Sequence, residues 1–406
     1  MFVPSGNLYF FYELLIVKMN ILYLTFYFEP DLSAGSFRNS PLAKELSKQG
    51  GENCHIDVVT TQPNRYSSFK VEAKEREDVG NMSIHRVDLP SHKSGMMDQV
   101  RSFRKYFTEA LKITKGKHYD LVFASSSRLF TAYLGYVIAR RKRIPLYLDI
   151  RDIFVDTMNN VMKNKFIKSL LIPFLKLIEK RTFNYATHIN LISAGFKPYF
   201  SKFKSPSYTY FTNGIDDIFI GNNLQPIRDN DGVFTITYAG NIGEGQGLHK
   251  IIPQAAAGLG SGYQFKVIGD GGAKSMLVAE LERLGVSNVE LLHPVSRNEL
   301  LEQYNNSDFL FLHLNDYEAF EKVLPSKIFE LATFNKPVVA GVGGYANRFI
   351  YENVDNVILF QPCDVDSMVA KMKNYEYKNV ERQEFIRKFS RDNINQDMAR
   401  SILSYL

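Results

Sequence analysis

The protein has 406 residues, of which 45% are hydrophobic and 23% are charged. This balance is typical of a folded globular protein and excludes a disordered or low-complexity chain, and the length suits two domains of roughly 200 residues each. Only Cys54 and Cys363 are present, which excludes a disulfide framework and a cysteine metal site and favours a reducing cytosol.

The net charge of +6 is concentrated in one segment. Residues 101–200 hold 19 Lys and Arg against 6 Asp and Glu, a net charge of +13, whereas residues 1–100 carry −2 and residues 201–406 carry −5. Within the basic segment, residues 162–181 (MKNKFIKSLLIPFLKLIEKR) space lysines through apolar residues. This pattern is typical of an amphipathic basic helix on an anionic membrane surface, and an ordinary solvated helix face explains it equally well.

The first 18 residues, MFVPSGNLYFFYELLIVK, form an apolar stretch that Glu13 interrupts. The stretch is too short to span a bilayer, and it lacks the basic start and the cleavage site of a signal peptide. Met19 then opens a buried-strand pattern. We therefore interpret residues 1–18 as an N-terminal extension and Met19 as the natural start. No later segment reaches about 18 uninterrupted apolar residues, so we expect no transmembrane span.

Short apolar strands alternate with helical patterns along the rest of the chain, which predicts parallel sheets with helices on both faces. The pattern loosens near residues 205–225, where we place a linker. Two doubly wound domains are therefore expected, and such folds bind ligands outside the carboxyl ends of their strands. The expected strands are residues 20–28, 55–62, 120–126, 145–151 and 187–193, then 234–240, 263–271, 289–295, 308–314, 336–342 and 356–361.

Residues 237–252, TYAGNIGEGQGLHKII, predict a strand, a glycine-rich turn and the start of a helix. The glycines let backbone N–H groups approach a ligand, and a helix N-terminus favours a phosphate. The spacing G-N-I-G-E-G matches a dinucleotide fingerprint, but no acidic residue ends the next strand to hold a ribose. A plain tight turn explains the glycines equally well.

A second motif, LPSKIFEL, follows the predicted strand at residues 308–314. Proline suits the first turn of a helix and serine can cap it. Lys327 and Glu330 are three residues apart and share one face. A lysine there can neutralise a diphosphate, and a carboxylate can accept two hydrogen bonds from ribose hydroxyls. A glutamate in a first helical turn is also favoured by the helix dipole, so the pattern alone leaves a structural role open.

Five motifs together resemble the retaining GT-B glycosyltransferases of family 4. In chain order they are FYFEPDLSAGSFRNSPLAKEL, TNGID, YAGNIGEGQGL, VIGDGGAKSML and PSKIFELATFNKPVVAG, and the resemblance covers the chain from about Met19 to its end. PSK before the glutamate, with Arg151 and Asp152 after the fourth strand, is most similar to the branch that builds bacterial O-antigen and capsule, including N-acetyl-fucosamine transferases.

The resemblance implies a GT-B fold, in which two Rossmann-like α/β domains face each other across a cleft. An N-terminal acceptor domain would cover residues 19–210 and a nucleotide-sugar domain residues 211–385. Residues 386–406 would form a helix that returns to the first domain.

The resemblance also implies a role for each matching residue. Lys327, preceded by Pro325 and Ser326, would pair with the diphosphate of the donor, and Glu330 would hold the ribose. Asp152, next to Arg151, would face the acceptor. The other donor contacts would come from Gly240, Asn241, Gly243 and Gly247 at the diphosphate, from Gly269, Asp270, Gly271 and the backbone near Val295 at the base, and from Gly35 and Arg38 of the first domain.

Two features depart from the family pattern. The wider family carries two glutamates with seven residues between them; Lys322 holds the first position here, and Glu321 is one place away. The sequence therefore does not predict the sugar-hydroxyl contacts that are credited to that glutamate. The loop NIGEGQG also lacks the Arg or Lys of many relatives, which leaves Lys327 as the main local cation.

No metal and no other cofactor is expected. Asp364 and Asp366 form a DVD sequence that resembles the metal-binding motif of another glycosyltransferase fold, but we interpret it as a helix cap. His249, His293 and His313 are not at ligand spacing.

The expected function is that of a retaining glycosyltransferase. The donor would be a nucleotide-diphosphate sugar, with UDP favoured, and the acceptor an undecaprenyl-diphosphate-linked glycan at the inner face of the cytoplasmic membrane; nucleic acid is not an expected partner. One alternative is a nucleotide-sugar epimerase or hydrolase of the same fold, against which the basic apolar run argues. Another is a non-catalytic nucleotide-binding scaffold. An NAD-dependent oxidoreductase is disfavoured because the first strand leads into FEPDLSAGS, not into a glycine fingerprint.

Overall fold

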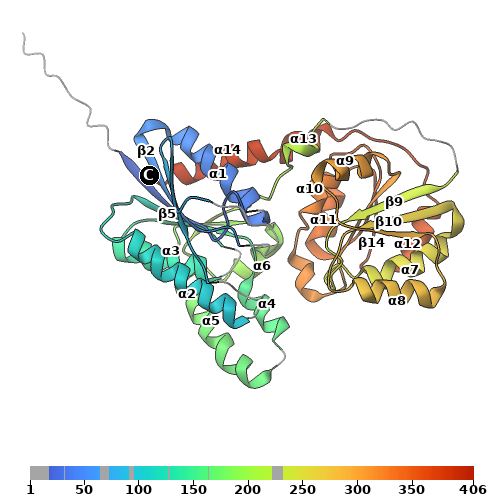
Figure 1. Ribbon diagram of the computed structural model, residues 1–406, viewed down its shortest axis with the longest axis horizontal. Coiled ribbons are helices and arrows are strands. Elements are labelled where there is room, and N and C mark those ends of the chain that lie inside the picture. The colour runs from blue at the N-terminus through green and yellow to red at the C-terminus, as the bar shows by residue number, and fades with distance from the viewer. Residues whose placement is uncertain are drawn as a thin grey trace, which may run out of the picture. The chain divides into compact units, whose positions relative to one another are not determined.

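The computed structural model describes residues 18–31, 33–64, 73–90, 96–126, 129–162, 164–221 and 232–406 (Figure 1). The predicted N-terminal extension, apart from Lys18, lies outside the described residues. By packing, the described chain divides into two compact units. The first is drawn from residues 1–125, 134–146 and 399–406, and the second from residues 126–133 and 147–398.

The strands of the N-terminal half belong to one sheet, in the order β3-β4-β2-β1-β5-β6-β7-β8. The strand pairings described in this sheet are parallel except for that of β3 with β4; β1, for example, places Met19 opposite Cys54 of β2. These strands are β1 (Met19–Leu24), β2 (Cys54–Thr61), β3 (Arg76–Val79), β4 (Met82–Val87), β5 (Leu121–Ser126), β6 (Leu146–Ile150), β7 (His188–Leu191) and β8 (Ser207–Thr209). The helices between and after them are α1 (Ala34–Gly50), α2 (Met96–Ile113), α3 (Leu129–Lys142), α4 (Phe154–Val161), α5 (Lys165–Tyr185) and α6 (Lys197–Phe200).

The strands of the C-terminal half form an all-parallel sheet in the order β11-β10-β9-β12-β13-β14. This is the 3-2-1-4-5-6 order of a doubly wound fold, and its order reverses between β9 and β12. The strands are β9 (Phe234–Ala239), β10 (Tyr263–Ile268), β11 (Val289–Leu292), β12 (Phe309–His313), β13 (Val338–Gly341) and β14 (Val357–Phe360). The helices are α7 (Leu248–Leu259), α8 (Lys274–Leu284), α9 (Arg297–Asn305), α10 (Lys327–Leu331), α11 (Gly344–Asn353), α12 (Val365–Lys373), α13 (Gln383–Phe389) and α14 (Arg391–Leu403).

The eleven predicted strands are all present, and three observed strands were missed. β3 and β8 lie at the two edges of the first sheet and are partly exposed, so they carry no apolar run. β4 is buried, but Ser, His and Arg interrupt its apolar residues. The predicted linker near residues 205–225 was therefore wrong in part, because it contains β8. The sheets separate along the chain between Thr209 and Phe234, and the finer domain boundaries stay a prediction.

Candidate functional site

Two glycine turns follow the neighbouring strands β9 and β10 and lie against each other. The N–H of Gly240 donates to the carbonyl of Ile268 at 2.9 Å, and the N–H of Ile242 donates to that of Asp270 at 2.8 Å. A Cβ on Gly269 would overlap the carbonyl oxygen of Gly240, and Gly269 has a φ of +149°. Only glycine fits this position. The structure thus brings together two motifs that are about 30 residues apart in sequence.

Lys327 lies at the carboxyl ends of the strands of the second sheet, where these two glycine turns also lie. A Cβ built on Gly240 would lie 3.5 Å from Cε of Lys327, so the lysine stem runs beside the first glycine of the loop. Nζ of Lys327 donates to Oε2 of Glu330 at 3.0 Å, and the two side chains keep 23% and 28% of their surface exposed. A cation and a carboxylate therefore face the glycine turns and remain accessible to a ligand.

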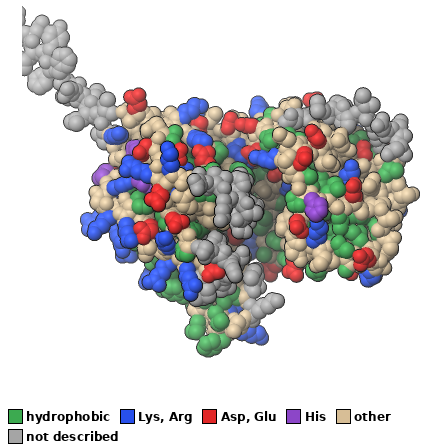
Figure 2. Space-filling view, in the orientation of Figure 1, with side chains coloured by type: hydrophobic (Ala, Val, Ile, Leu, Met, Phe, Trp, Pro, Cys, Tyr) green, Lys and Arg blue, Asp and Glu red, His purple; other side chains and the backbone are tan. Residues whose placement is uncertain are grey.

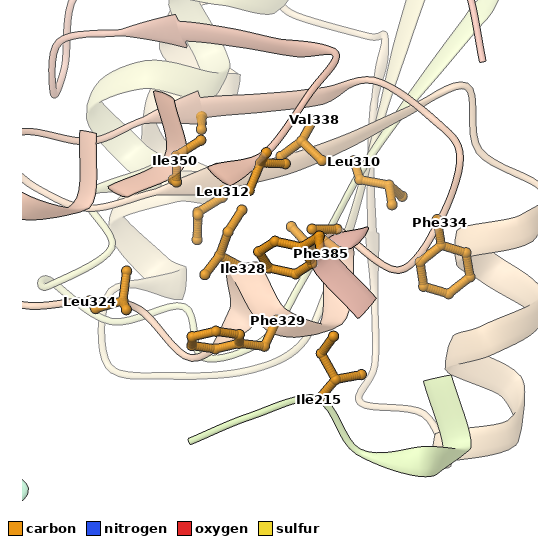
Figure 3. Close-up of a cluster of buried hydrophobic side chains, with 14 of the residues drawn as sticks. Ile215, Leu310, Leu312, Leu324, Ile328, Phe329, Phe334, Val338, Ile350 and Phe385 are labelled. Carbon is orange, nitrogen blue, oxygen red and sulfur yellow. The ribbon is translucent and has the colours of Figure 1, made fainter. Parts of the chain in front are cut away.

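The helix that carries this pair is fixed by its apolar residues. Ile328 and Phe329 are buried, and they point into a cluster that also contains Leu312 of β12, Ile350 of α11 and Phe385 of α13 (Figure 3). Because consecutive helical residues point in different directions, burial of these two side chains turns Lys327 and Glu330 away from the core. The alternation of charged and apolar residues in KIFEL is thus what orients the pair.

The charge state of Lys327 is set by its neighbours. Burial alone would lower the pKa of the ammonium group, but the nearby Tyr304 and Glu330 together raise this pKa above its usual value. Lys327 therefore carries a full positive charge at every physiological pH, which is what pairing with an anion requires.

Ser326 corrects one expectation. It occupies the N-cap position of α10, but its backbone is helical, and within this described turn its side chain makes no capping hydrogen bond. The turn closes through the backbone instead, because the carbonyls of Pro325 and Ser326 accept the N–H groups of Ile328 and Phe329 at 3.2 and 3.1 Å.

The glycine loop between β9 and α7 has internal hydrogen bonds. Oε1 of Gln246 accepts from Nδ2 of Asn241 at 3.0 Å and from the N–H of Gly243 at 3.2 Å. Gly247 has a φ of +60° and is the N-cap of α7. The predicted loop residues Asn241, Gly243 and Gly247 therefore belong to one closed turn.

Two residues at the carboxyl end of β12 hold this loop, His313 as the last residue of the strand and Asn315 just after it, and neither was predicted to do so. Nδ1 of His313 lies 2.6 Å from the carbonyl oxygen of Gln246. Asn315 donates through Nδ2 to the carbonyl of Glu244 at 2.7 Å and through its N–H to that of Gly245 at 2.9 Å. The signal in the sequence that pointed to this role is the position of His313 at the end of a strand beside the reversal of strand order.

The residues predicted near the base are more exposed. Asp270 follows β10 and accepts the N–H of Gly271 through Oδ1 at 2.9 Å, and Gly271 has a φ of +158°. Val295 follows β11 and is exposed. Both positions lie at carboxyl ends of strands of the second sheet, and their contact with a base stays a prediction.

Arg151 and Asp152 follow β6. The N–H of Arg151 donates to the carbonyl of Ser126 at 3.0 Å, and Oδ1 of Asp152 accepts from Oγ1 of Thr157 at 3.3 Å. Although the residue is exposed, desolvation of its carboxyl raises the pKa of Asp152, and the nearby Asp156 adds to this effect. Their role toward an acceptor stays a prediction.

Gly35 and Arg38 belong to the first unit and are buried on α1. The helix begins at a serine cap, because Oγ of Ser33 accepts the N–H of Ser36 at 3.1 Å. The carbonyl of Gly35 accepts from Nδ2 of Asn39 at 2.8 Å. The contact of Gly35 and Arg38 with a donor stays a prediction.

The position of the missing family glutamate is held by an ion pair. Nζ of Lys322 lies 2.8 Å from Oδ2 of Asp156. The carboxylate of Glu321 instead packs against Gly343 and Gly344 at the N-terminus of α11, where a Cβ on either glycine would collide with it. A carboxylate is favoured there by the helix dipole. Glu321 thus stabilises a helix end.

The DVD sequence is a helix cap, as predicted. Oδ1 of Asp364 accepts the N–H of Ser367 at 3.0 Å at the start of α12, and Asp366 lies in the first turn. Among the described residues, no group of three or more His, Cys, Asp or Glu side chains has the arrangement of a metal site. Independence of metal stays a prediction.

Comparison with known proteins agrees with this architecture. Residues 221–392 match the family model "Glycosyl transferases group 1". The "Putative colanic acid biosynthesis glycosyl transferase WcaI" of Escherichia coli (strain K12) is 23% identical over 185 residues, which are 42% of this chain and 45% of that protein. The chain therefore matches less than half the length of this relative.

Two solved structures are similar in fold across almost the whole chain. The lipopolysaccharide outer core galactosyltransferase WaaB, in its apo form, has a TM-score of 0.66 and 14% sequence identity, and the alignment covers 96% of this chain and 100% of that one. HepE of Anabaena, in complex with UDP, has a TM-score of 0.64 and 15% identity with the same coverage. The chain thus has the GT-B fold, two Rossmann-like α/β domains with mostly parallel sheets.

Proposed function

We propose that the protein is a retaining glycosyltransferase of family 4 that transfers a sugar from a nucleotide-diphosphate sugar to a lipid-linked glycan in bacterial surface polysaccharide synthesis. The observation that carries the proposal is the position of Lys327 beside Gly240, with Glu330 bonded to the lysine at 3.0 Å. A cation next to a glycine turn at the carboxyl edge of a parallel sheet suits a diphosphate.

The donor is bound by the second sheet. Backbone N–H groups of the glycine loop and the ammonium of Lys327 surround the diphosphate, and Glu330 accepts hydrogen bonds from the ribose hydroxyls. Gly269, Asp270 and Gly271, with the backbone near Val295, lie about the base. UDP is the favoured nucleotide; HepE, which has the same fold, was solved in complex with UDP.

The acceptor is an undecaprenyl-diphosphate-linked glycan, and Asp152 faces it. The colanic acid glycosyl transferase WcaI and the lipopolysaccharide galactosyltransferase WaaB both act, by their names, in surface polysaccharide synthesis. The proposed location is the cytoplasmic side of the membrane. Among the described helices, none combines the length and the apolar composition needed to cross a bilayer.

The reaction needs electrostatic help more than a strong protein base. As the bond between the anomeric carbon and the phosphate oxygen breaks, the sugar becomes oxocarbenium-like and negative charge builds on the diphosphate. Lys327 and the backbone N–H groups stabilise this charge. The acceptor oxygen bonds to the anomeric carbon on the face that the phosphate leaves, and the leaving phosphate takes the proton of the acceptor hydroxyl. Configuration at the anomeric carbon is then retained.

A thermal-shift screen of the full chain against UDP, GDP, ADP, dTDP and their sugars tests donor binding, because a ligand that binds only the folded state raises its apparent stability. We expect UDP compounds to raise the melting temperature. The matching nucleotide sugar, labelled in the sugar, should then deliver label to the lipid fraction of bacterial membranes. Absence of any nucleotide-dependent shift would contradict the proposal.

A further inference from the structure

α5 exposes an unusual number of large apolar side chains. Five of them are on its surface, and Phe166 and Leu170 are 74% and 65% exposed, whereas no other described element exposes more than one. The five are Phe166, Ile167, Leu170, Phe174 and Leu177. At 100° per residue they lie within an arc of about 100° on the helix. They therefore form one continuous stripe, which we call the α5 stripe.

The opposite side of α5 fixes the helix to the protein. Ile172, Leu175, Ile178 and Phe183 are buried, and Oδ1 of Asn164 caps the first turn by accepting the N–H groups of Phe166 and Ile167 at 3.1 and 3.2 Å. The stripe is thus presented on a capped and packed helix of 21 residues, which is about 31 Å long.

The charges of α5 are nearly all positive. Its basic residues are Lys165, Lys168, Lys176, Lys180 and Arg181. Its one acidic residue, Glu179, is only 3% exposed, and both of its carboxylate oxygens accept from the hydroxyl of Tyr199 at 2.8 Å. Within the described helix the accessible charges are therefore all cationic. At 100° per residue, Lys165, Lys176 and Lys180 lie along one border of the stripe. Figure 2 shows hydrophobic side chains gathered over the end of this helix.

We propose that the α5 stripe is a docking surface for an anionic lipid bilayer, on which α5 lies in the plane of the membrane. An apolar stripe bordered by lysines matches the two layers of such an interface, with acyl chains beneath and phosphate headgroups beside them. A second copy of the chain is a poorer occupant, because an antiparallel two-fold contact would bring the lysine borders of two helices together.

This inference deepens the proposed function, since a lipid-linked acceptor is presented at a bilayer surface. It nevertheless stands on α5 alone, and its test needs no enzymatic activity. The full chain is sedimented with phosphatidylcholine vesicles that contain about one third phosphatidylglycerol, and with pure phosphatidylcholine vesicles. We expect binding to the anionic vesicles and a loss of at least about tenfold in affinity on the neutral ones.

Three variants test the surface. The triple change Phe166→Ser, Leu170→Ser and Phe174→Ser should weaken vesicle binding by at least about tenfold, and each of Lys176→Gln and Lys180→Gln should weaken it by about fivefold. Tyr351→Ser on α11, which removes an equally exposed aromatic ring, should leave binding unchanged. Circular dichroism and the nucleotide-induced thermal shift should be the same in all of them.

Two results would overturn the proposal. One is that the triple variant binds anionic vesicles as tightly as the wild-type protein does. The other is a wild-type dimer, seen by light scattering, that becomes a monomer in the triple variant while vesicles bind neither protein, because the stripe would then serve a second copy. If the wild-type protein binds vesicles but no nucleotide raises its melting temperature, the result would contradict the proposed function and support the docking surface.

Discussion

The imidazole of His313 joins two loops at the carboxyl ends of the strands of the second sheet, and its partner on one side is Gln246. Nδ1 lies 2.6 Å from the carbonyl oxygen of Gln246, and Nε2 lies 2.9 Å from the backbone nitrogen of Cys363. A carbonyl only accepts and an N–H only donates, so Nδ1 carries the proton and Nε2 accepts. His313 is therefore neutral, and protonation at Nε2 would break its bond to Cys363.

This histidine makes stability depend on pH. Burial lowers the pKa of His313 to about 4, whereas an unfolded histidine has a pKa of about 6.5. Between these values the unfolded chain binds the extra proton, so the free energy of unfolding falls as the pH falls from 6.5 to 4, by up to about 3 kcal/mol from this group. In His313→Gln this part of the pH dependence should disappear, as measured by urea unfolding between pH 7 and 4.5.

His188 provides the matched comparison. Burial also lowers the pKa of His188 to about 4, but this residue is on β7 and bonds to Thr209 at 2.9 Å. His188→Gln should reduce the pH dependence in the same way without changing nucleotide binding. His313→Gln should also weaken nucleotide binding, because the glycine loop loses one of its anchors. An unchanged pH dependence in both variants would contradict the assignment.

Lys327→Met tests the cation at the donor site. A methionine keeps the stem beside Gly240 and the packing of α10 but removes the charge. Loss of a charged hydrogen bond should cost about 1.5–3 kcal/mol, so donor affinity should fall roughly tenfold to 150-fold. Calorimetric titration with the nucleotide sugar measures this. Lys373→Met, a change of an exposed lysine at the end of α12, is the control. Equal affinities in the two variants would remove Lys327 from the site.

Gly269→Ala tests the contact between the two glycine turns. The new Cβ would overlap the carbonyl oxygen of Gly240, and the φ of +149° is unfavourable for alanine. We expect a loss of about 2–4 kcal/mol in the free energy of unfolding. Gly272→Ala, three residues later, meets no atom within 4 Å and should change stability by less than about 0.5 kcal/mol. Comparable denaturation midpoints for the two variants would show that the turns are not tightly packed.

The core strands were predictable because buried parallel strands consist of nearly continuous apolar residues, as in β1 and β12. Edge strands lack that signal, which is why β3 and β8 were missed. The pair Lys327 and Glu330 was predictable because its spacing is local. The role of His313 was not, because its partners Gln246 and Cys363 are 67 and 50 residues away in sequence. Only the fold brings them together.

The α5 stripe was predictable only in part. Its lysine spacing and apolar residues are visible in the sequence, but the same pattern is compatible with an ordinary helix face. What distinguishes the two is which apolar residues the core uses. The core takes Ile172, Leu175 and Ile178 and leaves Phe166 and Leu170 exposed, and that choice depends on packing.

Asp152 offers a test of the acceptor side that is separate from donor binding. Asp152→Asn keeps an oxygen for the bond to Thr157 and removes the charge, so nucleotide binding should not change. Transfer to the lipid-linked acceptor should fall by about 100-fold, because the acceptor hydroxyl is no longer held in position by the carboxylate. Desolvation raises the pKa of Asp152. As the pH falls, the transfer rate of the wild-type protein should therefore begin to decrease at a higher pH than it would with an ordinary carboxyl group. Asp156→Asn removes a neighbouring charge that raises this pKa and should shift the decrease to lower pH. Thr157→Val removes a hydrogen bond that lowers it and should shift the decrease to higher pH. Shifts of the same sign in these two variants would show that Asp152 does not control the transfer step.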